Sequence, residues 1–161
     1  MIATLTETMT TINIKKTDEY YMRQALVEAQ LAFEQQEVPI GAIIVCKDRI
    51  IARAHNLTET LNDVTAHAEM QAITSAAATL GGKYLIDCTL YVTAEPCPMC
   101  AAALGWAQIA RIVYGATDEK RGFQKIAPSV LHPKTTVESG ILAEEAAALM
   151  QQFFQAKRHP K

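Results

Sequence analysis

The chain has 161 residues, half of them hydrophobic and a fifth charged, which is the balance of a globular protein and excludes a disordered chain. Its length fits one domain with a substantial core. It contains no apolar stretch long enough to cross a bilayer, and its N-terminus lacks the apolar core of a signal peptide. We therefore expect a cytoplasmic location and no membrane partner.

The net charge of −2 is unevenly distributed. Residues 1–110 carry 7 Lys and Arg against 12 Asp and Glu, whereas residues 111–161 carry 8 against 5. A positive C-terminal third favours an anionic partner, because phosphate binding needs local positive charge. The alternative, and the commoner case, is a solvated surface of mixed charge.

The first predicted elements are a helix and a hairpin. Apolar residues recur at three- and four-residue spacing over 18–36, which predicts a helix with one buried face and Thr17 as its N-cap. Residues 38–46 form a continuous apolar strand, and residues 50–56 form its hairpin partner. Residues 1–17 are assigned to an N-terminal extension whose order the sequence does not decide, ahead of a single domain over 18–161.

A polar loop over 57–64 precedes a second helix, for which Thr65 is the expected cap and Gly81 and Gly82 the expected end. The later predicted elements are a strand over 88–93, a helix over 97–108, a strand over 111–116, an irregular loop over 117–136, a short strand near 135–140, and a helix with Leu142, Ala146, Leu149, Met150 and Phe153 on one side. Strand, helix and strand with short links indicate a parallel pair. The pattern predicts an α/β protein of three layers, with a mixed sheet between helices.

Two short motifs contain the residues best suited to chemistry. Cys97 and Cys100 lie three residues apart at the start of a predicted helix, so both thiols can bind one ion, and the helix N-terminus favours the thiolate. His67 and Glu69 lie at the start of the preceding helix. With His67, Cys97 and Cys100 as ligands, a zinc ion keeps one open position, which is typical of a catalytic site. Glu69 is then well placed for proton transfer.

Other readings of the cysteines are weaker. A redox C-x-x-C pair has no need of the neighbouring histidine and glutamate. A structural zinc site requires a fourth ligand, for which Cys46 or Cys88 is the candidate, although both lie in apolar strands and resemble buried hydrophobic residues.

The order H-x-E followed by P-C-x-x-C is the signature of zinc-dependent nucleobase deaminases. The segments "EVPIGAIIV", "TAHAE", "LYVTAEPCPMC" and "RIVYGATDEKRG" resemble bacterial tRNA-specific adenosine deaminases of the cytidine/deoxycytidylate deaminase superfamily. The resemblance implies a three-layer α/β/α cytidine-deaminase-like fold with a central mixed five-stranded sheet, one Zn²⁺ per subunit, and a homodimer. It also implies hydrolytic conversion of adenosine to inosine at the tRNA wobble position, with the anticodon loop as partner and no DNA.

In this resemblance His67, Cys97 and Cys100 match the zinc ligands, and Glu69 matches the catalytic proton shuttle. The matching substrate-binding positions are Asn56, whose side chain would bond the base, Ala68, whose backbone N–H would face the substrate, Asp118 in a loop near the nucleotide, and Phe154.

Two of these assignments have structural alternatives. Asn56 would also suit a turn that closes the strand. Phe154 lies off the apolar stripe of the last helix and is the better candidate for RNA contact, whereas Phe153 suits the core equally well.

Two functional alternatives remain open at this point. A deaminase of a free base or nucleoside, such as guanine, cytosine or cytidine, would use the same zinc chemistry. A zinc-stabilised interaction domain would keep the fold without activity. The pI of about 6.1 gives RNA binding no support.

Overall fold

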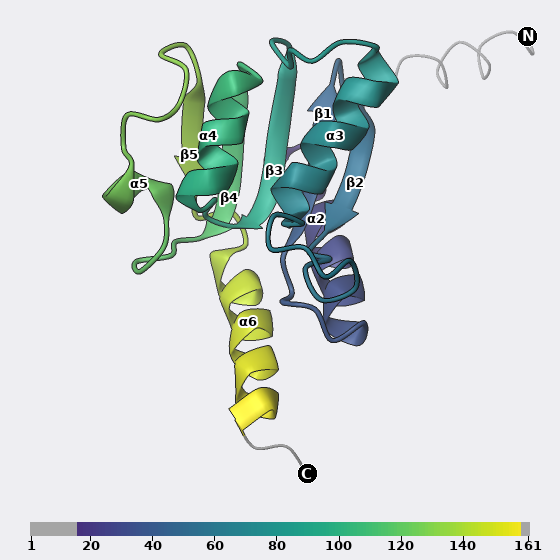
Figure 1. Cartoon of the computed structure of the whole chain (residues 1–161), viewed down its shortest axis with the longest axis vertical. Coiled ribbons are helices and arrows are strands. Elements are labelled where there is room, and N and C mark those ends of the chain that lie inside the picture. The colour runs from purple at the N-terminus through teal and green to yellow at the C-terminus, as the bar shows by residue number, and fades with distance from the viewer. Residues whose placement is uncertain (1–15, 159–161) are drawn as a thin grey trace, which may run out of the picture.

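The computed structural model describes residues 16–158, which form three layers (Figure 1). The helices are α2 (Asp18–Glu34), α3 (Ala68–Leu80), α4 (Pro98–Trp106), α5 (Phe123–Ile126) and α6 (Ala143–Arg158), and the strands are β1 (Gly41–Cys46), β2 (Arg49–His55), β3 (Cys88–Ala94), β4 (Arg111–Ala116) and β5 (Thr136–Ser139). Most of the predicted N-terminal extension, residues 1–15, lies outside the described residues. No helix between residues 16 and 158 is long and apolar enough to span a lipid bilayer.

The sheet has the order β2-β1-β3-β4-β5 and confirms the predicted mixed topology. β1 pairs antiparallel with both β2 and β3, whereas β3, β4 and β5 are parallel. The carboxyl ends of β3 and β4 therefore lie at the same edge of the sheet as the start of β1 and the end of β2. Four loops that are far apart in the sequence meet at this edge.

The two faces of the sheet have separate cores, because successive strand residues point to opposite sides. Ile44 of β1 packs in the core under α3 and α4, with Leu90, Leu104 and Ile112. The neighbouring Ile43 packs in the core under α2. α6 lies on the same face as α2 and extends past the end of the sheet (Figure 1).

The helix boundaries confirm most of the predicted caps. Thr17 accepts a hydrogen bond from the Tyr20 N–H at the start of α2, and Gly81 ends α3 with a left-handed φ of 71°. The predicted cap at Thr65 is wrong, because its N–H and hydroxyl both donate to the Asp63 carboxylate and form a turn before the helix. His67 is the N-cap residue of α3 instead.

The second difference is α5, a single helical turn inside the segment predicted to be irregular. Its first N–H, from Phe123, donates to the carbonyl oxygen of Pro96. This turn therefore depends on a contact between distant segments, which local periodicity does not reveal.

Gly41 allows β1 to pass directly beneath α2. A Cβ at this position would overlap the Ala25 carbonyl oxygen and the Ala29 nitrogen, both of which are rigid backbone atoms. We expect Gly41→Ala to lower the free energy of unfolding by about 3 kcal/mol, the upper part of the range for overpacked cores. Gly82→Ala is the matched control, because nothing lies within 4 Å of its Cβ position. Urea denaturation of the two variants should separate them, and equal stability would contradict the close approach.

An ion pair joins the start of α2 to the sheet. Arg111 on β4 donates to both carboxylate oxygens of Asp18 at 2.8 and 2.6 Å, and the Tyr91 hydroxyl donates to Asp18 at 2.7 Å. The hydrogen bond from Arg111 is the main cause that lowers the pKa of Asp18 below its usual 3.8. A carboxyl whose pKa is lower in the folded state stabilises the protein above its unfolded pKa and loses this effect as the pH falls.

We therefore expect Asp18→Asn to destabilise the protein by about 1 kcal/mol at neutral pH, because the pair is partly exposed to solvent. The difference from the unsubstituted protein should shrink below pH 3.8 and vanish below the lowered folded-state pKa. Urea unfolding across this pH range measures it. A difference that persists in acid would contradict the ion-pair explanation.

Candidate active site

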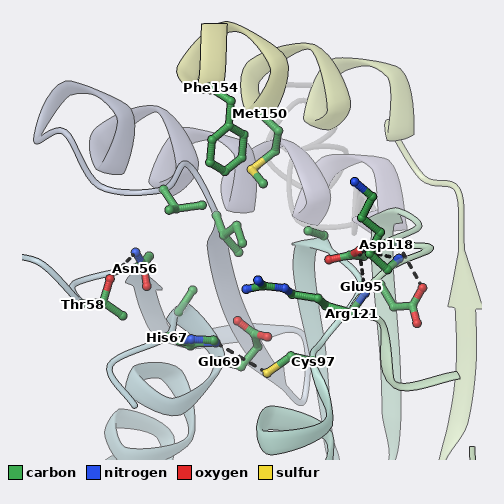
Figure 2. Close-up of a pocket in the computed structure, with 15 residues that line it drawn as sticks. Asn56, Thr58, His67, Glu69, Glu95, Cys97, Asp118, Arg121, Met150 and Phe154 are labelled. Carbon is green, nitrogen blue, oxygen red and sulfur yellow. Dashed lines mark hydrogen bonds between the residues drawn. The ribbon is translucent and has the colours of Figure 1, made fainter. Parts of the chain in front are cut away.

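The edge of the sheet where the four loops meet contains a cavity of about 470 Å³. Figure 2 shows its lining residues converging from α3, from the segment before β1, from the loops after β2, β3 and β4, and from α6. The lining residues are Val38, Ile40, Asn56, Thr58, His67, Ala68, Glu69, Ala94, Glu95, Cys97, Asp118, Lys120, Arg121, Met150 and Phe154. Every predicted site residue lines this cavity except Cys100, which is fully buried behind Cys97 and contacts His67.

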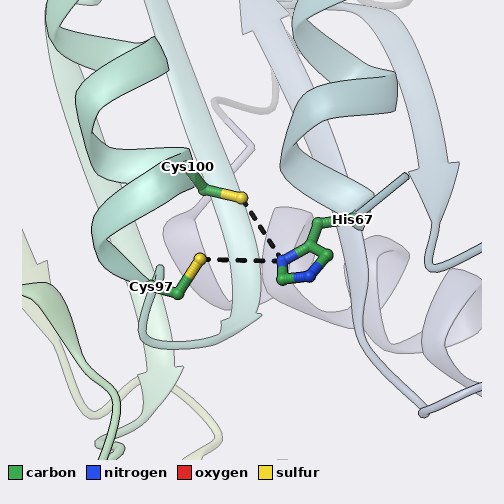
Figure 3. Close-up of side chains that lie close together, drawn as sticks. All are labelled: His67, Cys97 and Cys100. Atoms are coloured by element: carbon green, nitrogen blue, oxygen red, sulfur yellow. Dashed lines mark hydrogen bonds between the residues drawn. The ribbon is translucent and has the colours of Figure 1, made fainter. Parts of the chain in front are cut away.

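The predicted metal ligands lie together at the N-terminal ends of α3 and α4 (Figure 3). His67 is the N-cap residue of α3 and Cys97 that of α4, with Cys100 in its first turn. The His67 Nδ1 atom is 3.7 Å from the Cys97 Sγ and 3.5 Å from the Cys100 Sγ. In a tetrahedral zinc site, bonds of about 2.0 Å to nitrogen and 2.3 Å to sulfur place these donors about 3.5 Å apart. The three side chains therefore fit a zinc ion.

Cys46 and Cys88 are not part of this cluster. They are buried and face each other across β1 and β3. Among residues 16–158, the His67, Cys97 and Cys100 group is the only set of three or more His, Cys, Asp or Glu side chains arranged to bind a metal. The geometry gives no support to a structural site closed by a fourth cysteine.

Hydrogen bonding from Cys100, with a further contribution from His67, lowers the pKa of the Cys97 thiol to about 4. The reciprocal bond from Cys97 raises the pKa of His67, and contact with Cys97 also raises the pKa of Cys100. A bound divalent cation favours the thiolate form of both ligands.

Glu69 is the acidic group of the cavity floor. It lies in the first turn of α3, is 4% exposed, and faces the same space as His67 and Cys97 (Figure 2). Burial raises the pKa of its carboxyl to about 6. A carboxyl with this pKa can both accept and donate a proton near neutral pH, as general acid–base chemistry requires.

Comparison with known proteins agrees with this geometry. Residues 15–116 match the model of the cytidine and deoxycytidylate deaminase zinc-binding region, a stretch that contains His67, Glu69, Cys97 and Cys100. The chain belongs to this deaminase family.

Several relatives of the deaminase cover nearly its whole length. The tRNA-specific adenosine deaminase of Agrobacterium fabrum is 46% identical over 144 residues, covering 86% of this chain and 95% of that protein. The tRNA-specific adenosine deaminase of Bacillus subtilis is 44% identical over 149 residues, covering 89% and 92%.

Solved structures confirm the predicted cytidine-deaminase-like fold. One, from studies of A-to-I editing by tRNA:A34 deaminases at the wobble position of transfer RNA, has a TM-score of 0.76 and 46% identity, covering 81% of this chain and 98% of that one. The guanine deaminase of Bacillus subtilis has a TM-score of 0.63 and 32% identity, covering 91% and 98%.

The two neighbouring phenylalanines of α6 differ in burial. Phe153 is 5% exposed and packs edge-on against Phe33 of α2, so it is a core residue. Phe154 is 40% exposed and lines the cavity, where its ring points from α6 toward the other lining residues (Figure 2). Because Phe154 lies off the apolar stripe of this helix, the sequence favours it over Phe153 for contact with a ligand. Its position at the cavity agrees with that expectation.

Sequence reasoning missed two polar residues of the deaminase cavity, Thr58 and Glu95. Thr58 accepts a hydrogen bond from the Asn56 amide at 3.1 Å, and Glu95 lines the opposite wall. Glu95 carried a usable signal, since an acidic residue directly after an apolar strand often marks a site. Thr58 lies in a polar loop, where no local pattern distinguishes it from other surface residues.

Proposed function

We propose that this deaminase converts adenosine to inosine at the wobble position of tRNA, consuming water and releasing ammonia. The observation that carries the proposal is the open cavity with His67, Cys97 and Cys100 at its floor and Glu69 beside them. The choice of tRNA is supported by relatives of 44% and 46% identity that are tRNA-specific adenosine deaminases over nearly their whole length.

His67, Cys97 and Cys100 would hold one zinc ion per chain, with one coordination position open to the cavity. When bound, zinc acts as a Lewis acid that brings the pKa of a water near neutrality and so supplies a nucleophile for the purine ring. The three ligands come from the ends of two packed helices, which fixes where the attack takes place.

Glu69 moves the protons of the reaction. It accepts a proton from the attacking water and delivers one to the ring nitrogen beside the reacting carbon. A further proton transfer to the amino group lets the carbon–nitrogen bond break, and ammonia leaves. The burial that raises the pKa of Glu69 keeps this exchange close to neutral pH.

Asn56 and Ala68 would orient the base. Asn56 is almost fully buried, and its bond to Thr58 fixes the side-chain amide at the cavity wall. The Ala68 N–H belongs to the first turn of α3, where backbone donors have no acceptor within the helix. The apolar side chains of Val38 and Ile40 would contact the base, which has to leave the RNA stack to enter such a cavity.

The rim of the cavity suits an extruded nucleotide of an anticodon loop. The exposed ring of Phe154 offers a stacking surface, and Asp118, Lys120 and Arg121 line the other side. Aromatic stacking and cationic side chains are the usual means by which proteins bind single-stranded RNA. We propose that these residues contact the nucleotides that flank the target base.

A substrate panel tests the proposed function. The deaminase is incubated with an RNA anticodon stem-loop that has adenosine at the wobble position, with the equivalent DNA stem-loop, and with free adenosine, cytidine, cytosine and guanine. The proposal predicts that the RNA stem-loop has by far the highest kcat/KM. Rapid turnover of a free base with none on the stem-loop would overturn it.

The similarity to a guanine deaminase gives the second candidate, a free-base deaminase, one specific observation in its favour. The identity of 32% is well below the 46% shared with the tRNA-specific relative. In the panel, preferential turnover of guanine would favour this candidate. No turnover of any substrate by the zinc-loaded protein would favour the third hypothesis, a zinc-stabilised interaction domain without activity.

We also propose that the enzyme is a cytoplasmic homodimer, like the family that its sequence resembles. The end of α4 supports a partner, because Trp106 is 84% exposed beside a hollow formed by α4 and residues 130–132. Sedimentation analysis should show a dimer that Trp106→Glu weakens. A monomeric unsubstituted protein would contradict the assembly.

A further inference from the structure

Glu95 is a buried carboxylate that the proposed reaction does not use. It lies between the end of β3 and the cysteine motif and is 6% exposed. Its Oε1 accepts the N–H of Asp118 at 3.2 Å, and its Oε2 accepts the N–H of Gln124 at 3.1 Å. Hydrogen bonds to a charged acceptor are stronger than neutral ones, especially away from water. One side chain thus holds both ends of the loop that follows β4.

The glycine at position 122 allows this arrangement. A Cβ there would overlap the Glu95 carboxylate, so a larger residue would push the loop away from the acid. The loop is closed further by the Gly122 N–H, which donates to the Asp118 carbonyl at 2.9 Å. Glu95 and Gly122 are therefore two halves of one contact.

Asp118 shapes the same loop from within. Its Oδ1 accepts the backbone N–H groups of Lys120 and Arg121 at 3.0 and 2.9 Å. The turn directs the guanidinium of Arg121 into the cavity, on the side of Glu69 (Figure 2). Within residues 16–158, neither Lys120 nor Arg121 forms an ion pair with a carboxylate, so their charges are available to an anion.

We propose that Glu95 is a positioning residue that holds the 117–124 loop so that Lys120 and Arg121 bind a phosphate flanking the target nucleotide. Glu95 also precedes the metal ligand Cys97 by two residues, so it fixes this loop relative to the reacting centre. The inference rests on the proposed function, because the phosphate is that of an RNA substrate. The loop would thereby select a nucleotide within a chain over a free nucleoside.

The carboxylate is needed because it presents two acceptors to two backbone donors. A glutamine has the same shape but only one acceptor oxygen, and its NH₂ group would face an N–H donor. Glu95→Gln should therefore release one end of the loop without leaving a cavity. Gly122→Ala breaks the same contact from the other side.

We expect Glu95→Gln to raise the KM for the RNA stem-loop about tenfold, the effect of losing one charge-assisted hydrogen bond, with much less change in kcat. Zinc content should stay at the level of the unsubstituted enzyme. The slope of log affinity against log salt should decrease by about one when a phosphate contact is lost. Arg121→Gln should reduce the salt slope in the same way. The double variant Glu95→Gln, Gly122→Ala should have nearly the same KM and salt slope as either single variant, because both changes break the same contact.

Hydrogen exchange gives a second readout, independent of turnover. In the Glu95→Gln enzyme the amides of Asp118 and Gln124 should exchange faster, while those of α3 stay unchanged. Glu138→Gln is the control, because this residue pairs with Arg111 at a distance from the cavity. It should leave KM, salt slope and loop exchange unaltered.

Two results would overturn the proposal. An unchanged KM and salt slope in Glu95→Gln would show that the loop needs no such support to bind RNA. Loss of zinc or an equal loss of kcat on every substrate would make Glu95 a residue of the metal site instead. If the unsubstituted enzyme neither binds nor converts the stem-loop, the proposed function and the phosphate site both fail. The hydrogen exchange of the Asp118 and Gln124 amides then still tests whether Glu95 holds the loop.

Discussion

Glu69→Gln is expected to lower kcat by on the order of 10²–10⁴-fold, the range typical of a lost general acid–base group. The amide fills the same buried space but cannot take a proton from water or pass one to the ring nitrogen. Because Glu69 is not among the predicted ligands, zinc should remain bound. Single-turnover rates with the RNA stem-loop, together with metal analysis of the same preparation, measure both parts of this prediction.

A suitable control is Glu28→Gln, which alters a carboxylate that is also buried but lies on α2 outside the cavity. This variant should retain most of the activity. Glu69→Gln with full activity would show that the proton transfer takes place elsewhere. A variant that had lost its zinc would instead place Glu69 in the support of the metal site.

Cys97→Ser should abolish zinc binding and, with it, catalysis. Altering a group that merely supports a ligand costs about 10–100-fold in metal affinity, so removing a ligand itself should cost more. Serine keeps the size of the side chain but its hydroxyl stays protonated, whereas the Cys97 thiol has a pKa of about 4. Metal analysis after dialysis should find less than about one tenth of an equivalent of zinc in the variant.

The matched control is Cys46→Ala, which removes a buried thiol that lies outside the metal cluster. It should retain zinc and activity. Unsubstituted protein stripped with a chelator should regain activity when zinc is added back, whereas Cys97→Ser should not. Full activity of Cys97→Ser without zinc would rule out the metal-dependent reaction.

The fold was predictable where side-chain periodicity reflects one buried face. The helix predicted over 18–36 and the strand predicted over 38–46 are present as α2 and β1, although β1 begins three residues later than its apolar run. The start of α3 was misplaced because Thr65 has the chemistry of a cap, but Asp63 competes for its hydrogen bonds. The bonds of Thr65 to the Asp63 carboxylate form a turn, and the helix begins after His67 instead.

The candidate site was predictable to a different extent. The C-x-x-C pair of Cys97 and Cys100 together with the H-x-E motif of His67 favours a shared ion over a redox pair, so the proximity of the three side chains could be expected. The contact of Glu95 with the 117–124 loop could not, because it depends on two parallel strands ending at the same edge of the sheet. A residue that positions a loop through backbone hydrogen bonds forms no motif with its partners, so the sequence does not predict the contact.

The most direct test of the central claim is to map inosine in a complete tRNA. A transcript with adenosine at the wobble position and at other exposed positions is treated with the zinc-loaded enzyme, and inosine and ammonia are both measured. We predict inosine at the wobble position alone, with one ammonia released for each inosine formed, and no product with Glu69→Gln. An unchanged wobble adenosine under conditions in which the same preparation deaminates free guanine would contradict the account.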